Sequence, residues 1–175
     1  MIKVGIIGFG VVGQRRKKYI EKNKSYNLCC VSDISFKKDY KTKKINFYQD
    51  YRKSTKHELD AVFITLPNYL AVKVTSFFLK KNIHVFCEKP PARNINELKQ
   101  VLKEFKKKKN TIKLKYGFNH RYHDSIMLAK KIIDSKKYGR LINLKGLYGK
   151  SKMTPFTGGW RTKKSMAGGG ILLDQ

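Results

Sequence analysis

The sequence predicts an α/β fold in which a doubly wound parallel sheet is followed by the start of a second α/β domain. Between residues 3 and 118, short apolar runs alternate with segments of helical periodicity, as expected of strands joined by crossover helices. The runs are almost continuously apolar, which is typical of strands covered on both faces. Apolar residues are 41% of the 175 residues, enough for a packed core.

Strands are expected at residues 3–7, 27–32, 47–51, 61–66, 84–87 and 114–118, with 47–51 the weakest. Helices are expected at 11–20, around Val72, Phe77 and Leu79 with an end near Asn82, and at 95–105. The third helix is the best marked. Asn94 can cap it, and Glu97 can return a hydrogen bond three residues on, a variant of the capping box.

After Asn119 the pattern changes. One helix is expected around Met127 and Ile133 and ends before Gly139, and residues 141–147 alternate as a strand with one exposed face. One helix and one strand are too few to close a core. We therefore expect residues 1–119 to form one domain, residues 120–175 to be the incomplete beginning of a second with a mainly antiparallel open sheet, and the chain to be a fragment.

The composition restricts the class of protein. No apolar run is long enough to span a membrane, and no secretory signal is present, so a membrane partner is not expected. Three cysteines without metal-ligand spacing indicate reduced thiols and a cytoplasmic location. The net charge of +28 fits a general lysine bias better than specific nucleic-acid binding, because lysines are scattered and far outnumber arginines.

A glycine-rich turn provides the first functional signal. Gly8, Gly10 and Gly13 form G-x-G-x-x-G directly between the first expected strand and the first expected helix. Such a turn brings a pyrophosphate close to the backbone and to free helix N–H groups. Asp33 follows the second strand, where a carboxylate accepts hydrogen bonds from a ribose. This pattern predicts a Rossmann domain that binds NAD, and the nearby Lys37 and Lys38 keep NADP open as an alternative.

The contacts expected with this cofactor come from the turn, from Asp33 and from two further strand ends. The expected cofactor-binding residues are Gly8, Phe9, Gly10, Val11, Val12, Gly13, Asp33, Thr65, Pro67, Asn68, Glu88 and Lys89. For Asn68 the alternative is a helix cap, and for Glu88 it is a structural role in the turn before Lys89.

Three further segments carry a family resemblance: HVFCEKPP at residues 84–91, GFNHRY at 117–122 and GGGILLD at 168–174. With the glycine turn, they make the chain similar to the glucose–fructose oxidoreductase, inositol dehydrogenase and MocA family. The resemblance implies an NAD(P)-dependent oxidoreductase that acts on a carbinol of a sugar, a cyclitol or a nucleotide-linked sugar. It also implies a homo-oligomer for the full-length protein.

The same resemblance implies the site residues. It makes Lys89 the lysine that contacts the reacting hydroxyl, and Asp174 the carboxylate of a D-x-x-x-H motif whose histidine falls beyond this sequence. Both are expected to serve catalysis and substrate binding. A histidine suits removal of the hydroxyl proton, and a lysine ammonium stabilises developing alkoxide charge.

Other substrate contacts are expected from Asn119 and Arg121, after the last strand of the first domain, and from Trp160 and Arg161 in the glycine-rich stretch. A ring and a guanidinium are common where proteins bind sugars, although plain loop packing is the alternative. No metal role is expected for His120 and His123. Two other functions stay open: a non-catalytic dinucleotide sensor of the same fold and, more remotely, a basic nucleic-acid-binding protein.

Overall fold

The computed structural model describes residues 1–108, 111–147, 159–170 and 173. They belong to two compact units. The first unit contains Met1–Gly117 together with Gly159–Gln175, and the second contains Phe118–Gly158. The expected division into domains at residues 1–119 and 120–175 stays a prediction.

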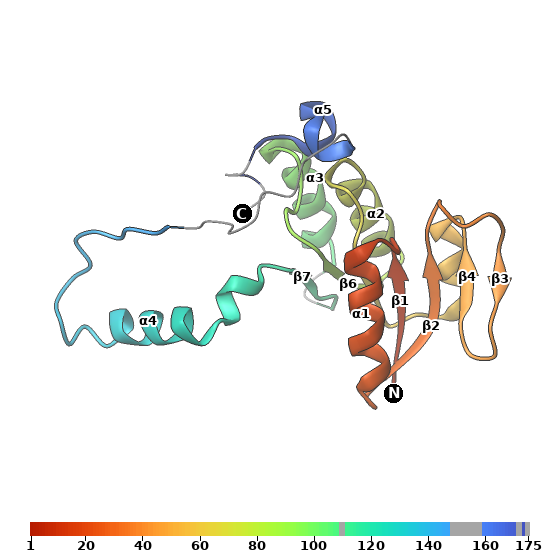
Figure 1. Cartoon of the computed structure of the whole chain (residues 1–175), viewed down its shortest axis with the longest axis horizontal. Coiled ribbons are helices and arrows are strands. Elements are labelled where there is room, and N and C mark those ends of the chain that lie inside the picture. Colours follow the sequence, from red (N-terminus) through yellow and green to blue (C-terminus); the bar gives the residue numbers. More distant parts are fainter. Residues whose placement is uncertain (109–110, 148–158, 171–172, 174–175) are drawn as a thin grey trace. The chain divides into compact units, whose positions relative to one another are not determined.

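The first unit is built on a seven-stranded sheet with the order β3-β4-β2-β1-β5-β6-β7 (Figure 1). Every neighbouring pair is parallel except β3 and β4. The strands are β1 (Ile2–Ile7), β2 (Tyr26–Ser32), β3 (Tyr40–Lys41), β4 (Asn46–Tyr48), β5 (Ala61–Ile64), β6 (His84–Cys87) and β7 (Leu114–Tyr116). The predicted doubly wound parallel sheet is therefore confirmed.

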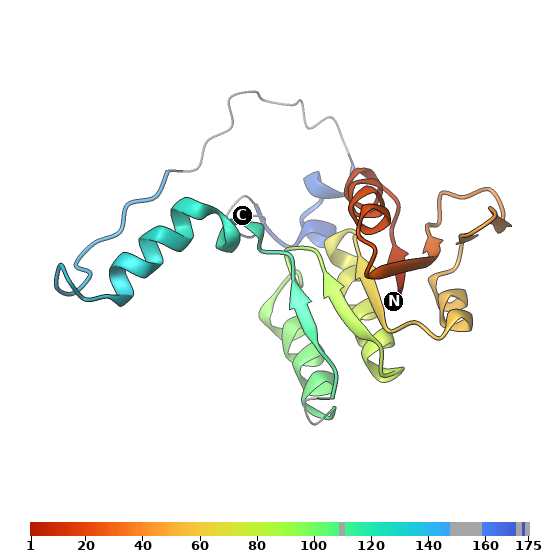
Figure 2. The same ribbon diagram turned by 90° about the horizontal axis from the view of Figure 1, so that it is seen from below.

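Helices cover both faces of this sheet (Figures 1 and 2). They are α1 (Val11–Lys22), the 3-10 helix η1 (Tyr51–His57), α2 (Asn68–Lys80) and α3 (Ile95–Lys106). On one face, Ile20 of α1 packs with Val4 and Ile6 of β1. On the other face, Ile7 belongs to a core that includes Phe78 of α2 and Val101 of α3. The side chains of β1 alternate between the two cores, as a strand requires.

The start of α3 differs in detail from the predicted capping box. Asn94 caps the helix as expected, because its Oδ1 accepts from the Glu97 amide at 3.0 Å. The Glu97 carboxylate, however, accepts from the Arg93 amide at 2.9 Å and from the Arg93 guanidinium. The ion pair with Arg93 turns this carboxylate toward the residue before the cap, so the reciprocal bond forms one position earlier than expected.

In the second unit the structure contradicts one prediction. A 3-10 helix η2 (Asn119–Tyr122) and a helix α4 (Asp124–Asp134) are present, but the expected strand at 141–147 is not formed. A strand needs a hydrogen-bonded neighbour, and no strand of the described residues pairs with this segment. Alternation of apolar and polar residues therefore did not suffice to make a strand here.

The described end of the chain returns to the first unit. It contains a 3-10 helix η3 (Trp160–Thr162) and a short helix α5 (Lys164–Ala167). Ala167 is buried, and its carbonyl oxygen accepts a hydrogen bond from Asn68 Nδ2 at 2.7 Å. Within the described ranges, no helix is both long and apolar enough to cross a bilayer.

Candidate functional site

The glycine turn lies where the strand order of the sheet reverses. β1 leads through α1 to β2 on one side, whereas its other neighbour β5 leads through α2 to β6 on the opposite side. Ligands of open parallel sheets bind beyond the carboxyl ends of the strands at such a point. Gly8 follows β1 there and Thr65 follows β5, so the turn occupies the usual ligand position.

Two of the glycines are required by close backbone contacts. Gly8 has φ +95, and a Cβ atom built on it would lie 2.7 Å from the Thr65 carbonyl oxygen. A Cβ atom on Gly13 would overlap the Gly8 carbonyl oxygen. The Thr65 hydroxyl donates to that same oxygen at 2.6 Å. Thr65 therefore holds the turn in shape, which is a structural task beside the cofactor contact predicted for it.

The middle glycine differs, because it faces open space. A Cβ atom on Gly10 would meet no atom within 4 Å. Gly10 precedes the first turn of α1, where Val11 is 68% exposed and Val12 is 38% exposed. The first N–H groups of a helix have no partner within it and carry its positive dipole end. An open, uncharged turn against free N–H groups fits a bound pyrophosphate.

The second expected cofactor contact is Asp33, directly after β2. Its Oδ2 accepts from the Phe9 amide at 2.5 Å and its Oδ1 from the Ser35 amide at 2.8 Å. Burial opposes ionisation, but these hydrogen bonds outweigh it and hold the pKa of Asp33 below its usual value. Each carboxylate oxygen retains a lone pair for a ribose hydroxyl. Asp33 thus connects the glycine turn to the place expected for the ribose.

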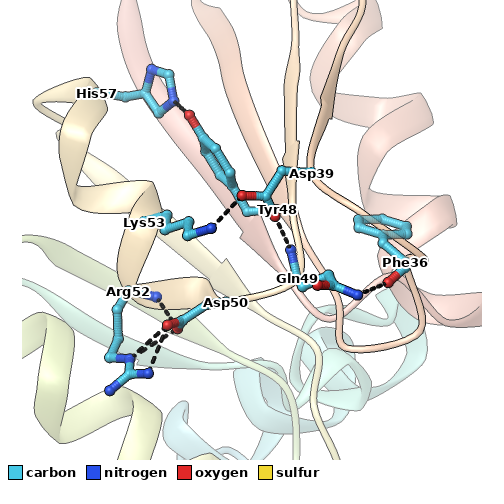
Figure 3. Close-up of polar contacts among 8 residues, drawn as sticks. All are labelled: Phe36, Asp39, Tyr48, Gln49, Asp50, Arg52, Lys53 and His57. Carbon is cyan, nitrogen blue, oxygen red and sulfur yellow. Dashed lines mark hydrogen bonds and ion pairs between the residues drawn. The ribbon is translucent and has the colours of Figure 1, made fainter.

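Hydrogen bonds and an ion pair from residues just after β4 and in η1 hold the segment that follows Asp33 (Figure 3). The Gln49 amide donates to Asp39 Oδ1 at 2.9 Å, and the Gln49 side chain donates to the Phe36 carbonyl oxygen. Asp39 also forms an ion pair with Lys53. These contacts hold the stretch that contains Lys37 and Lys38, the two lysines that keep NADP open as an alternative.

Among the residues after β5, Pro67 lies at the N-terminus of α2 and has no amide hydrogen to donate. Asn68 is 5% exposed, and its amide group donates to Ala167 as described above. This hydrogen bond is neither the cofactor contact nor the helix cap that was expected of Asn68. Its side chain joins α2 to the returning segment at the end of the chain.

The E-K-P motif, formed by Glu88, Lys89 and Pro90, follows β6. Glu88 Oε1 accepts from Arg16 Nε at 2.7 Å and forms an ion pair with the same guanidinium. Lys89 is half-buried, and its peptide bond with Pro90 is cis. This ion pair gives Glu88 a structural role, and the cofactor contact expected of it stays a prediction.

The expected substrate residues fall in different parts of the chain. Trp160 and Arg161 belong to the first unit, where the Arg161 guanidinium lies 4.3 Å from the centre of the Trp160 ring. Asn119 and Arg121 lie on η2 of the second unit, and both are exposed. Asp174 lies outside the described residues. The substrate roles of these five residues stay predictions.

One residue of this region was missed by sequence reasoning. Arg16 lies three residues after Gly13 and four before Ile20, the two buried residues of α1. Helical spacing therefore places Arg16 on the buried face of α1, which is unusual for an arginine unless a carboxylate accepts from it. That position was the available signal, but it does not reveal the partner.

The sheet order, the open Gly10 position and the Asp33 hydrogen bonds together define a dinucleotide-binding Rossmann unit. Residues 2–116 match the family described as "Oxidoreductase family, NAD-binding Rossmann fold". The chain therefore belongs to the GFO_IDH_MocA oxidoreductase family. This membership confirms both the resemblance stated above and the expected NAD-type cofactor.

Individual relatives cover the same region. The chain is 32% identical over 121 residues to levoglucosan dehydrogenase of Pseudarthrobacter phenanthrenivorans, covering 67% of this chain and 30% of that protein. It is 27% identical over 163 residues to inositol 2-dehydrogenase of Salmonella typhimurium, covering 88% of this chain and 48% of that protein. The chain thus spans less than half the length of these relatives.

A solved structure shows the same architecture. The scyllo-inositol dehydrogenase of Lactobacillus casei with bound NAD(H) and scyllo-inositol is 25% identical to this chain, with a TM-score of 0.69. The match covers 79% of this chain and 42% of that protein. A dinucleotide is therefore bound by a solved structure of this fold.

Proposed function

We propose that this chain is the cofactor-binding part of an NAD-dependent oxidoreductase that acts on a carbinol of a sugar or cyclitol, with nucleotide-linked sugars as a further substrate class. The observation that carries the proposal is the open Gly10 position between the helix N-terminus and Asp33. Relatives named as dehydrogenases of levoglucosan and inositol support the substrate class. NAD is favoured over NADP because an ionised Asp33 repels a 2′-phosphate.

In the proposed reaction each residue has one task. The free N–H groups at the start of α1 bind the pyrophosphate, and Asp33 accepts from the adenosine ribose. Bound NAD supplies the hydride acceptor. Lys89 donates a hydrogen bond to the carbinol oxygen and stabilises the negative charge that develops when the proton leaves. Asp174 and the histidine of the D-x-x-x-H motif remain part of this proposal by resemblance alone.

The remaining expectations also belong to this proposal. We expect a cytoplasmic protein that forms a homo-oligomer at full length and binds neither membranes nor specific nucleic acids. A non-catalytic dinucleotide sensor is the second candidate, since the same glycine turn would serve it. The retained Lys89 favours the enzyme, because a sensor has no need of a charge beside a reacting hydroxyl.

The test has two stages. Calorimetric titration of the chain with NADH, and separately with NADPH, measures cofactor binding, and Asp33→Ala is expected to weaken NADH binding more than NADPH binding. The natural gene product is then assayed for NADH formation on a panel of sugars, cyclitols and nucleotide sugars, with Lys89→Gln as the matched variant. Turnover lost in Lys89→Gln with NADH binding retained supports the enzyme. Binding without turnover on the whole panel supports the sensor, and no binding contradicts both.

A further inference from the structure

An ion pair joins α1 to the segment that carries Lys89. Arg16 lies in the second turn of α1, and Glu88 immediately precedes Lys89 after β6. Nε and Nη2 of Arg16 both donate to Glu88 Oε1. The two residues are 72 positions apart in sequence, so the contact depends on the folded sheet.

The surroundings of this pair are shaped to hold it. The Arg16 guanidinium lies 4.9 Å from the centre of the Phe86 ring, which stacks under it. A Cβ atom at Gly117 would lie 2.6 Å from Glu88 Oε2, so the glycine leaves room for the carboxylate in this orientation. The side chains of Arg16 and Glu88 are only 32% and 17% exposed. A planar guanidinium with two donors and a ring contact holds one orientation, whereas a lysine at this position would not.

The pair also connects two parts of the candidate site. α1 begins at the glycine turn, whose free N–H groups face the expected pyrophosphate, and Glu88 is adjacent in sequence to Lys89. A shift of the Glu88 backbone would therefore move the point from which Lys89 extends. Arg16 resists such a shift from the same helix that carries the phosphate-binding end.

We propose that Arg16 is a positioning residue, which acts through Glu88 to fix Lys89 relative to the cofactor. This inference rests on the proposed function, because it takes Lys89 to lie beside the nicotinamide and the reacting hydroxyl. Arg16 itself touches neither. Its loss is expected to reduce turnover while leaving the phosphate-binding turn, and so most of the cofactor affinity, intact.

The test compares Arg16→Gln with Arg15→Gln. Both variants remove one positive charge from neighbouring positions of α1, but Arg15 is exposed. The first readout needs no turnover: the chain is treated with an amine-reactive ester with and without saturating NADH, and acylation of Lys89 is measured by mass spectrometry of its peptide. NADH is expected to protect Lys89 in the wild type and in Arg15→Gln, and to protect it at least about threefold less in Arg16→Gln.

The second readout is kinetic and uses the natural gene product. Arg16→Gln is expected to lower kcat about 10- to 100-fold, because displacing a catalytic group such as Lys89 by up to about 1 Å has an effect of this size. The dissociation constant for NADH is expected to change less than about threefold, since the contacts that bind phosphate are retained. If Arg16 had a merely structural role, its loss would instead lower thermal stability and change kcat and the dissociation constant for NADH together.

Further variants keep the result interpretable. Arg16→Lys retains the charge over Phe86 without the paired donors. In this variant, the protection of Lys89 by NADH should be intermediate between that in the wild type and that in Arg16→Gln. The double variant Arg16→Gln/Glu88→Gln should lose no more than Arg16→Gln, because both changes remove the same contact. If Arg16→Gln does not fold, Arg16→Lys decides the question by the same readout.

The outcomes separate the inference from the proposed function. Wild-type chain that binds NADH without protecting Lys89 contradicts the proposed site, whatever the variants do. Protection in the wild type that is equal in Arg16→Gln, Arg16→Lys and Arg15→Gln overturns the role of Arg16 and leaves the proposed function standing. Reduced protection confined to the Arg16 variants supports both.

Discussion

Alanine substitution at Gly10 and at Gly13 should affect stability differently, although both glycines belong to one motif. Gly10 has φ −69 and an empty surrounding, so an alanine methyl group fits the unliganded protein without strain. At Gly13 a methyl group would overlap the Gly8 carbonyl oxygen and lie 3.1 Å from its carbonyl carbon. The first change therefore affects the space for a ligand, and the second affects the fold.

The magnitudes follow from these surroundings. Gly10→Ala lowers the entropy of the unfolded chain but is a slightly poorer helix cap, so the free energy of unfolding should change by less than about 1 kcal/mol. Its methyl group takes the space proposed for the pyrophosphate. Loss of one charge-assisted phosphate–amide hydrogen bond, about 1.5–3 kcal/mol, corresponds to roughly 10- to 150-fold weaker NADH binding.

Gly13→Ala forces the helix away from the turn. Overpacking of this kind costs about 1–3 kcal/mol, and for a chain of this size each kcal/mol lowers Tm by about 2–4 °C. We therefore expect a Tm about 2–12 °C below that of the wild type. Binding of NADH should weaken as well, because the turn no longer has its native shape.

Thermal melts followed by circular dichroism, together with calorimetric NADH titrations of wild type and both variants, measure these quantities. We expect nearly unchanged stability with weakened NADH binding in Gly10→Ala, and reduced stability in Gly13→Ala. Gly10→Ala with wild-type affinity for NADH would refute the assignment of the open space to the pyrophosphate. Gly13→Ala with wild-type Tm would refute the packing role.

Three further predictions concern the same unit. Folding lowers the pKa of Asp33, so the ionised carboxylate stabilises the protein fully above the usual aspartate pKa of about 3.9. This stabilisation is lost as pH falls through the lower pKa of the folded state. The difference in the free energy of unfolding between wild type and Asp33→Asn, measured by urea unfolding, should therefore shrink below about pH 4. Asn68→Ala should cost about 1–2 kcal/mol and speed hydrogen exchange around Ala167, whose carbonyl loses its donor, whereas unchanged exchange would contradict the bond. Burial raises the pKa of Cys30 to about 12, so iodoacetamide should modify the half-exposed Cys29 first; preferential labelling of Cys30 in the folded chain would contradict this.

The sequence alone was sufficient for the elements whose signals are local. Continuous apolar runs located β1, β2, β5 and β6 to within a few residues, because a strand covered on both faces needs apolar side chains throughout. The glycine turn could also be located from its spacing between a strand and a helix. Segments with weak local signals were missed: β3 has only two residues, and η1 has no helical periodicity.

Only the tertiary structure decided contacts between residues distant in sequence. The partner of Glu88 is Arg16, and the partner of Asn68 is Ala167, 99 positions away, and no local pattern encodes either pair. The segment at 141–147 also shows that a local pattern is not sufficient. Its apolar and polar residues alternate as in a strand, but it forms no strand because no strand in the described part of the chain pairs with it. Apolar periodicity reports which face of an element is buried, whereas the identity of what lies against that face depends on how the whole sheet is assembled.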